Sequence, residues 1–327
     1  MNKNGNHINY YLLLNTIGNA EWILGMKIVR DRSNGTLFLN QEVYLEKVIN
    51  SFYMSECKPA STPEIVGVTL SKLDSPVTID DIVAMKHIPM ENIVGSLLYA
   101  ALCTRPDIAH AVNIISRFMK TPGKKHWIAA KHIVRYLKGT KTLGLTFKKQ
   151  VTTNNNSENN NDNTCLNMIG YSDSDWGNNI DTRKSTTGFC ISLDGNMIGW
   201  CSKGQATVAL STAEAEYMAI SATIQEILWI QSLIKEIFNI NSQNQGQGQG
   251  KLKNVTLSTL LYCDNQSALA ISKNDISHQR TKHIDIRHHF VRDCIAHHVL
   301  TIDYIPSGNN LADLFTKPLS KYTFHFL

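Results

Sequence analysis

Residues 210–227 read LSTAEAEYMAISATIQEI, and this stretch decides the fold of the second half of the chain. The run Ser211-Thr212-Ala213-Glu214 matches a capping box, so we expect a long helix from here to about Phe238. Its apolar residues fall on one stripe: Ala213, Tyr217, Ile220, Ile224 and Ile227. At about 100° per residue, Glu216 lies about 40° from Ile220 and inside the stripe, whereas Glu214 lies about 120° away, towards solvent. A carboxylate on a buried stripe is costly unless it is paired or binds a cation, so Glu216 is a candidate functional residue.

The segments around this helix alternate between strand and helix patterns. We expect strands at Asn167–Tyr171, Gly188–Leu193, Asn196–Cys201, Leu257–Cys263 and Val299–Ile305. Asp194-Gly195 is expected to join two of them as a hairpin turn, because both residues tolerate a positive φ. Further helices are expected at about Gln266–Ser272, at about Thr281–His297 and from near Leu311. The order βββ-α-β-α-α-β-α predicts an α/β fold of the α+β mixed type, with a mixed sheet and helices on its faces.

Three more carboxylates stand at the ends of expected elements. Asp173 and Asp264 each follow an apolar strand, and Asp313 lies at the start of the last helix. Taken singly, each could simply start a turn or favour a helix N-terminus. Together with Glu216 they are hard oxygen ligands of the kind that suits Mg²⁺ or Mn²⁺. Two such ions about 3.5–4 Å apart support in-line hydrolysis of a phosphodiester. Asp303, in contrast, lies on the polar side of its strand and is expected to be solvated.

The first half is predicted to be mostly helical. We expect two short strands at Trp22–Val29 and Thr36–Leu39, followed by a helix at Gln41–Phe52. After a loop at 55–90 we expect three more helices: Glu91–Cys103, one that begins at Thr104-Arg105-Pro106-Asp107, and His126–Lys138. Thr104 is expected to cap the second of these three helices.

The net charge of +5 conceals an uneven distribution. From Ile108 to Ser157 there is no acidic residue, while ten basic residues occur there: Arg117, Lys120, Lys124, Lys125, Lys131, Arg135, Lys138, Lys141, Lys148 and Lys149. Because clustered Lys and Arg gain affinity for phosphate backbones through counterion release, the pattern favours an anionic polymer as partner. Lys124, Lys125, Lys131 and Arg135 are the predicted contacts; a merely basic surface is the alternative.

Composition excludes several classes of protein. With 43% apolar residues the chain can bury a core, and its longest mainly apolar stretch, Ile93–Cys103, is too short to span a bilayer. The seven scattered cysteines suggest reduced thiols in an intracellular protein. Residues 153–163 and 241–250 are almost purely polar, so we expect disorder there. The expected organisation is a first domain over 1–150, a linker over 151–166, and a second domain over 167–327 with an insertion at 241–254.

Six segments of the second half resemble the ribonuclease H domain of the Pol polyproteins of copia-type LTR retrotransposons: GYSDSDWG (170–177), RKSTTGFCI (183–191), LSTAEAEYMA (210–219), LYCDNQSAL (261–269), KHIDIRHHF (282–290) and LADLFTKPL (311–319). The first half is similar to the end of the same polyprotein's reverse transcriptase in its thumb and connection, at LGMKI (24–28), STP (61–63), VGSLLYAALCTRPDI (94–108) and RYLKGT (135–140). The resemblance implies a ribonuclease H-like fold with a five-stranded mixed sheet.

The resemblance also implies a chemistry. It assigns catalysis and the binding of two Mg²⁺ ions, with Mn²⁺ as a substitute, to Asp173, Glu216, Asp264 and Asp313, and it implies cleavage of the RNA strand of an RNA/DNA hybrid. Phosphate contacts are expected from Arg183, Lys184, Lys203 and Gln205, and contacts to 2′-hydroxyls from Asn265, Gln266 and Ser267. The remainder of the polyprotein is an expected partner; no membrane and no small organic cofactor is expected. The family places such proteins in cytoplasmic virus-like particles or the nucleus.

Departures from the family pattern leave alternatives open. The chain contains no Tyr-x-Asp-Asp, and Asp80-Asp81 lacks that context, so we expect no polymerase activity. The loop 305–312 has no His, and Ser202-Lys203-Gly204-Gln205 has one basic residue fewer than the family's segment. One alternative is a remnant without catalytic activity that only binds nucleic acid. Another is a zinc site on the helix that carries His283 and Cys294, although about 16 Å of helical rise separates these two.

Overall fold

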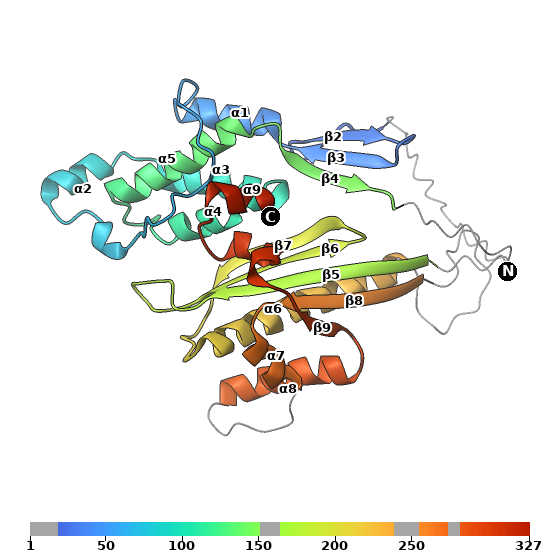
Figure 1. Ribbon diagram of the computed structural model, residues 1–327. Coiled ribbons are helices and arrows are strands. Elements are labelled where there is room, and N and C mark those ends of the chain that lie inside the picture. The colour runs from blue at the N-terminus through green and yellow to red at the C-terminus, as the bar shows by residue number, and fades with distance from the viewer. Residues whose placement is uncertain (1–18, 151–163, 239–254, 274–281) are drawn as a thin grey trace, which may run out of the picture.

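The computed structural model describes residues 19–150, 164–238, 255–273 and 282–327. The chain forms two halves, each with its own sheet and its own hydrophobic core (Figure 1). No helix in this described part is long and apolar enough to cross a membrane. The predicted insertion 241–254 lies outside the described residues, as does the predicted linker except for 164–166, which already belong to a strand.

The second half is built on a five-stranded sheet in the order β7-β6-β5-β8-β9. Its strands are β5 Thr164–Asp175, β6 Thr186–Leu193, β7 Asn196–Gly204, β8 Val255–Cys263 and β9 Thr301–Tyr304. β5, β6 and β7 are antiparallel neighbours, whereas β8 is parallel to both β5 and β9. Asp194 and Gly195 form the predicted turn between β6 and β7, with φ values of 48° and 75°.

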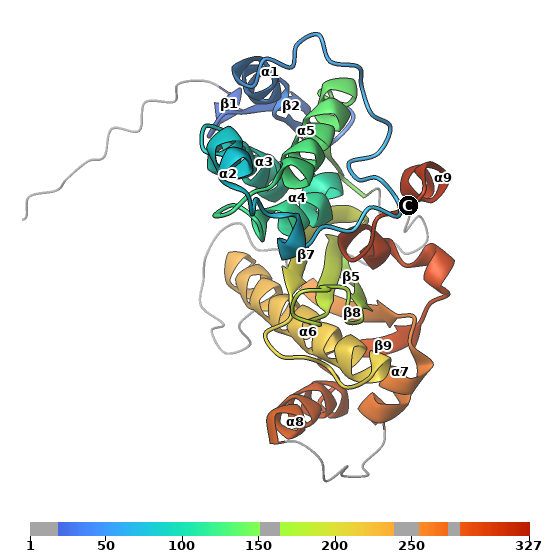
Figure 2. The same cartoon turned by 90° about the vertical axis from the view of Figure 1, so that its left-hand side faces the viewer.

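Three helices lie on the side of this sheet that faces away from the first half (Figures 1 and 2): α6 Thr212–Ile237, α7 Gln266–Lys273 and α8 Lys282–Ala296. The apolar stripe of α6 packs on the sheet, because Tyr217, Ile220, Ile224 and Ile227 belong to the buried core. This mixed sheet with its flanking helices confirms the predicted ribonuclease H-like fold.

The N-terminus of α6 differs slightly from the predicted capping box. The side chain of Ser211 accepts a hydrogen bond from the backbone N–H of Glu214 at 3.2 Å, as predicted. The carboxylate of Glu214, however, accepts from the N–H of Leu210 at 2.8 Å. The helix therefore begins at the predicted residue, and the Glu214 carboxylate has a structural role at the N-terminus of α6.

The first half contains more sheet than the sequence predicted. Its four strands form an antiparallel sheet: β1 Trp22–Ile23, β2 Met26–Asp31, β3 Thr36–Asn40 and β4 Gly144–Lys148. The helices of this half are α1 Glu42–Ser51, α2 Ile79–Met85, α3 Met90–Cys103, α4 Ala109–Ser116 and α5 Lys124–Gly139, of which α1 contacts β2. β4 was not predicted, because its partner β3 lies about a hundred residues earlier and leaves no local hairpin pattern.

Two other predictions about the first half were wrong. The segment 55–90 is not a continuous loop, since it contains α2; the apolar side chains of this short helix are exposed, so it shows no amphipathic pattern. Asp80 and Asp81 lie in the first turn of α2; they are not in a hairpin, as predicted. Thr104 does not cap a helix: its hydroxyl donates to Oε1 of Gln41 at 2.7 Å, and α4 begins five residues later, after a short 3₁₀ turn.

The two halves are in direct contact through polar links. The indole N–H of Trp200 on β7 donates to the carbonyl of Ala101 on α3 at 2.8 Å. Asp181 accepts from the hydroxyl of Ser71 at 2.7 Å and from the backbone N–H of Lys72 at 2.9 Å. The first half therefore lies against the face of the second sheet that the helices leave open.

Candidate active site

Two of the predicted carboxylates lie side by side because β5 and β8 are parallel neighbours. Ser172 on β5 is paired with Cys263 on β8, so the next residues, Asp173 and Asp264, lie side by side at the same edge of the sheet. Asp173 is inside β5 and not at its end, since the strand continues to Asp175. The Asp264 carboxylate does not cap the following helix, because the side chain of Asn265 accepts the N–H of Ala268 at 2.9 Å.

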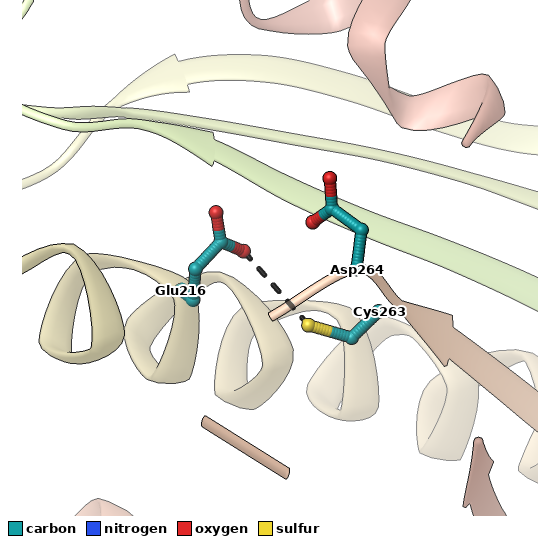
Figure 3. Close-up of side chains that lie close together, drawn as sticks. All are labelled: Glu216, Cys263 and Asp264. Atoms are coloured by element: carbon teal, nitrogen blue, oxygen red, sulfur yellow. Dashed lines mark hydrogen bonds between the residues drawn. The ribbon is translucent and has the colours of Figure 1, made fainter. Parts of the chain in front are cut away.

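Glu216 reaches the same edge from α6 (Figure 3). Its carboxylate is 6% exposed and accepts the backbone N–H of Ser174 at 3.2 Å. The thiol of Cys263 donates to its other oxygen at 4.0 Å, as the dashed line in Figure 3 marks. The inward position that the helical stripe predicted for Glu216 is thus what the structure shows.

Asp313 is brought to the site by the 3₁₀ helix Leu311–Phe315, η4, which lies across β5 and β6. The amide of Asn310 donates to the carbonyl of Ser172 at 3.1 Å, and the hydroxyl of Thr316 donates to the Asp173 carboxylate. A Cβ at Gly188, the partner of Asp173 across β5 and β6, would come within 2.5 Å of the Thr316 side chain. A glycine at this position is therefore what allows η4 to approach the sheet.

The four carboxylates form two overlapping groups whose ligand atoms lie within 4.8 Å of one another: Asp173, Asp264 and Asp313 in one, and Glu216, Cys263 and Asp264 in the other. Asp264 belongs to both groups. Burial raises the pKa of the Cys263 thiol, so it stays protonated and acts as a donor to Glu216. The remaining donors are carboxylate oxygens, which are the ligands that hard divalent cations prefer.

Without a cation, protons and a lysine offset the negative charge of this site. Burial, then the charges of Asp173 and Asp264, raise the pKa of Glu216 to about 9. Burial and the charge of Asp173 raise the pKa of Asp313 to about 7, although Lys317 acts in the opposite direction. The ammonium of Lys317 lies 2.9 Å from an oxygen of Asp313 and 3.8 Å from one of Asp173. Buried carboxylates with such raised pKa values are typical of functional sites.

Thr316 and Lys317 were not singled out from the sequence. Both lie within the segment LADLFTKPL, of which only Asp313 was predicted to be a functional residue. Their contacts depend on the path of the chain after η4, and no local pattern predicts it.

The predicted nucleic-acid contacts fall into two sets. In the second half, Arg183, Lys203, Gln266 and Ser267 are exposed and Lys184 is half-buried. Gln205 is buried, and its amide donates to Thr187 at 3.1 Å and to the carbonyl of Ala215 at 2.9 Å. The amide oxygen of Asn265 is used as a helix cap. These internal bonds favour a structural role for Gln205 and Asn265.

The other set lies on α5 in the first half, and several of its members have intramolecular partners. Lys125 forms an ion pair with Asp74 at 2.5 Å, and Arg135 donates to the carbonyl of Lys58 at 2.7 Å. The ammonium of Lys131 lies 5.8 Å from the centre of the Trp127 ring. Lys124 is exposed. As for the zinc alternative, neither potential metal group among the described residues includes a histidine; the side chain of His283 lies outside the described part, so this alternative stays a hypothesis.

Comparison with known proteins identifies relatives over nearly the whole chain. The retrovirus-related Pol polyprotein from transposon TNT 1-94 of Nicotiana tabacum is 41% identical over 308 residues, which are 94% of this chain and 21% of the relative. The one from transposon RE1 of Arabidopsis thaliana is 36% identical over 290 residues, or 88% of this chain and 17% of the relative. The chain thus spans about a fifth of the length of these relatives.

Other comparisons contribute less. No family model matches the chain. Among solved structures, a ribonuclease H1 isolated from compost is 14% identical and covers 46% of this chain and 92% of its own, with a TM-score of 0.33. The assignment of the fold therefore depends on the strand order and directions described above.

Proposed function

The chain belongs to the retrovirus-related Pol polyproteins of copia-type transposons, and we propose that its second half is a ribonuclease H that hydrolyses the RNA strand of an RNA/DNA hybrid. The observation that supports this most strongly is the convergence of four carboxylates from β5, α6, the end of β8 and η4 into two groups that share Asp264. A structural role alone does not account for them, because four buried or half-buried carboxylates gather around one lysine, and burial and mutual repulsion raise the pKa of Glu216 and Asp313.

In this proposal Asp173, Glu216, Asp264 and Asp313 hold two Mg²⁺ ions, with Mn²⁺ as a substitute. When bound, such ions supply an activated water and stabilise the leaving oxygen of the phosphodiester. The protein's part is to place the ligands. Glu216 gives up its proton to become a ligand, and its hydrogen bond from Ser174 orients the carboxylate. Asp264 connects the two positions, and Thr316 fixes the orientation of Asp173.

The proposed partner is an RNA/DNA hybrid, bound at the edge of the sheet where the carboxylates converge. The exposed Gln266 and Ser267 lie two and three residues after Asp264 and are proposed to contact 2′-hydroxyls in the minor groove, and Arg183 and Lys203 are proposed to contact phosphates. The rest of the polyprotein is a further proposed partner, and the site of action would be the particle or nucleus in which the element is copied. We propose no polymerase activity for this chain.

The test is cleavage of a hybrid that carries a label on its RNA strand, with Mg²⁺, Mn²⁺ or EDTA. We expect RNA cleavage that requires the metal and is lost, by at least about a hundredfold, in Asp173→Asn and Glu216→Gln. Asp303→Asn is the matched control, because this aspartate is exposed on β9 of the same sheet. Hybrid binding without cleavage by folded wild-type protein in Mn²⁺ would instead support the remnant that only binds nucleic acid.

A further inference from the structure

The segment that carries Asp313 continues into the first half of the molecule. After η4 the chain runs to a short helix, α9 Lys321–Phe326, which lies beside the helices of the first half in Figure 1. We call residues 311–327 the C-terminal arm. Its beginning contributes to the candidate active site, and its end packs on the hydrophobic core of the first half.

At the site, the arm is held closely against the second sheet. Phe315 is 1% exposed, and a Cβ at Gly188 would lie 2.8 Å from its Cβ. Thr316 and Lys317 both contact Asp173, as described above. The position of Asp313 therefore depends on how this short stretch is seated.

At the other end, the arm is held by the side chain of Phe324. Its ring packs edge-on against Tyr136 of α5, with 5.7 Å between ring centres and 88° between their planes, and it joins the core of the first half. An edge-to-face pair of this kind contributes beyond the area it buries. Phe324 is the residue by which α9 docks on the first half, since Tyr322 and Phe326 on the same helix are 83% and 64% exposed.

The surface that receives Phe324 is itself fixed by a buried network. The hydroxyl of Tyr136 donates to Asp107 at 2.6 Å, and the buried Arg105 pairs with the same carboxylate at 2.7 Å. Arg105 also donates to the carbonyl of Thr140 at 2.9 Å, just after α5 ends. Buried, fully paired networks of this kind hold side chains in one arrangement.

Between its two ends the arm follows the first half. Leu314, Lys317 and Leu319 line a small cavity together with 62–64, Asp107 and Phe324. Both halves thus contact the residues that connect η4 to α9.

We propose that the first half positions Asp313: docking of Phe324 on Tyr136 keeps the C-terminal arm seated, so that the carboxylate cluster is complete only while α9 is docked. This inference rests on the function proposed above, since it gives Phe324 and Tyr136 the role of positioning residues for that site. It assigns the first half a function in the nuclease that does not require any polymerase chemistry.

The test uses the full chain with Phe324→Ala, Phe324→Leu and, as matched control, Tyr322→Ala. The first readout is backbone hydrogen exchange of residues 311–320 without metal, referenced to β5. Phe324→Ala is expected to accelerate exchange in 311–320 about tenfold or more, while exchange in β5 is unchanged. The exchange rate of 311–320 in Phe324→Leu should lie between those of Phe324→Ala and the wild type, and the rate in Tyr322→Ala should equal that of the wild type. The second readout is Mg²⁺ affinity by titration calorimetry, expected to fall about tenfold in Phe324→Ala, as for other changes in residues that support metal ligands.

The proposal is overturned if Phe324→Ala leaves exchange in 311–320 at the wild-type rate, or if β5 is accelerated equally, because the effect would then be one of global stability. If Phe324→Ala does not fold, the proposal is overturned when residues 311–320 of Phe324→Leu exchange at the wild-type rate. Absence of hybrid cleavage by the wild type would refute the proposed nuclease function, yet exchange would still show whether the first half holds Asp313.

Discussion

Replacement of Glu216 by Gln is expected to stabilise the metal-free protein while it abolishes cleavage. The pKa of this buried carboxyl is raised from 4.5 to about 9, so the folded protein keeps a proton that the unfolded chain has lost at neutral pH. The folded state then binds more protons than the unfolded one, and its stability falls as pH rises from about 4.5 towards 9. At about 1.4 kcal/mol per pH unit, the cost accumulated by pH 7 is about 3 kcal/mol.

Gln resembles the protonated carboxyl in shape and carries no charge, so it avoids this cost. In EDTA, the free energy of unfolding of Glu216→Gln should exceed that of the wild type by about 1–3 kcal/mol at pH 7–8, and the two should converge near pH 5. Urea denaturation across this pH range measures the difference. The difference between variant and wild type is the quantity to compare, because burial lowers the pKa of His126 and His132 and gives a pH dependence of the opposite sign.

Glu236→Gln serves as the control, since Glu236 is exposed near the other end of α6. Addition of Mg²⁺ should then stabilise the wild type and leave Glu216→Gln almost unchanged, because only the wild type retains the full ligand set. The reasoning would be refuted if Glu216→Gln were no more stable than the wild type in EDTA at pH 8.

Two further substitutions examine the packing and the charge of the same site. Gly188→Ala places a methyl group 2.5 Å from the side chain of Thr316, so overpacking should lower the free energy of unfolding by about 1–3 kcal/mol and reduce cleavage. Gly204→Ala is the control in the denaturation and cleavage assays, because no atom lies within 4 Å of a Cβ at that position. Lys317→Met removes the cation paired with Asp313, so we expect the metal-free protein to melt at a lower temperature and the gain in Tm on addition of Mg²⁺ to be about 2–4 °C larger than in the wild type. Lys321→Met, which changes an exposed lysine of α9, should leave both melting temperatures unchanged. A gain for Lys317→Met equal to that of the wild type would contradict the reasoning that Lys317 and Mg²⁺ offset the same carboxylate charge.

Local patterns predicted those features that local geometry controls. The buried position of Glu216 followed from the period of α6, and the β6–β7 turn from Asp194-Gly195, because a helix face and a two-residue turn are set by neighbouring residues. Pairings over long sequence distances were not predicted in the same way: the first half is mostly helical, as expected, but β4 and its pairing with β3 were missed.

The candidate site shows the same division. The apolar stripe of α6 identified Glu216, and the family resemblance identified all four carboxylates, which the structure brings together. The roles of Lys317 and Thr316 and the docking of Phe324 depend on the three-dimensional path of the C-terminal arm. No periodic pattern of apolar residues in the sequence predicts such a path.

The parallel pairing of β5 with β8 also has a kinetic consequence. The hairpins β5–β6 and β6–β7 join neighbouring segments and can form early, whereas β5 and β8 meet only after a loop of about ninety residues has closed. We therefore expect Asp173 to be in place before Asp264 approaches it, so that the repulsion between the carboxylates arises late in folding. A divalent cation present during refolding should accelerate these late steps and leave the early hairpins unaffected, so the ligand of the finished site would also assist its assembly.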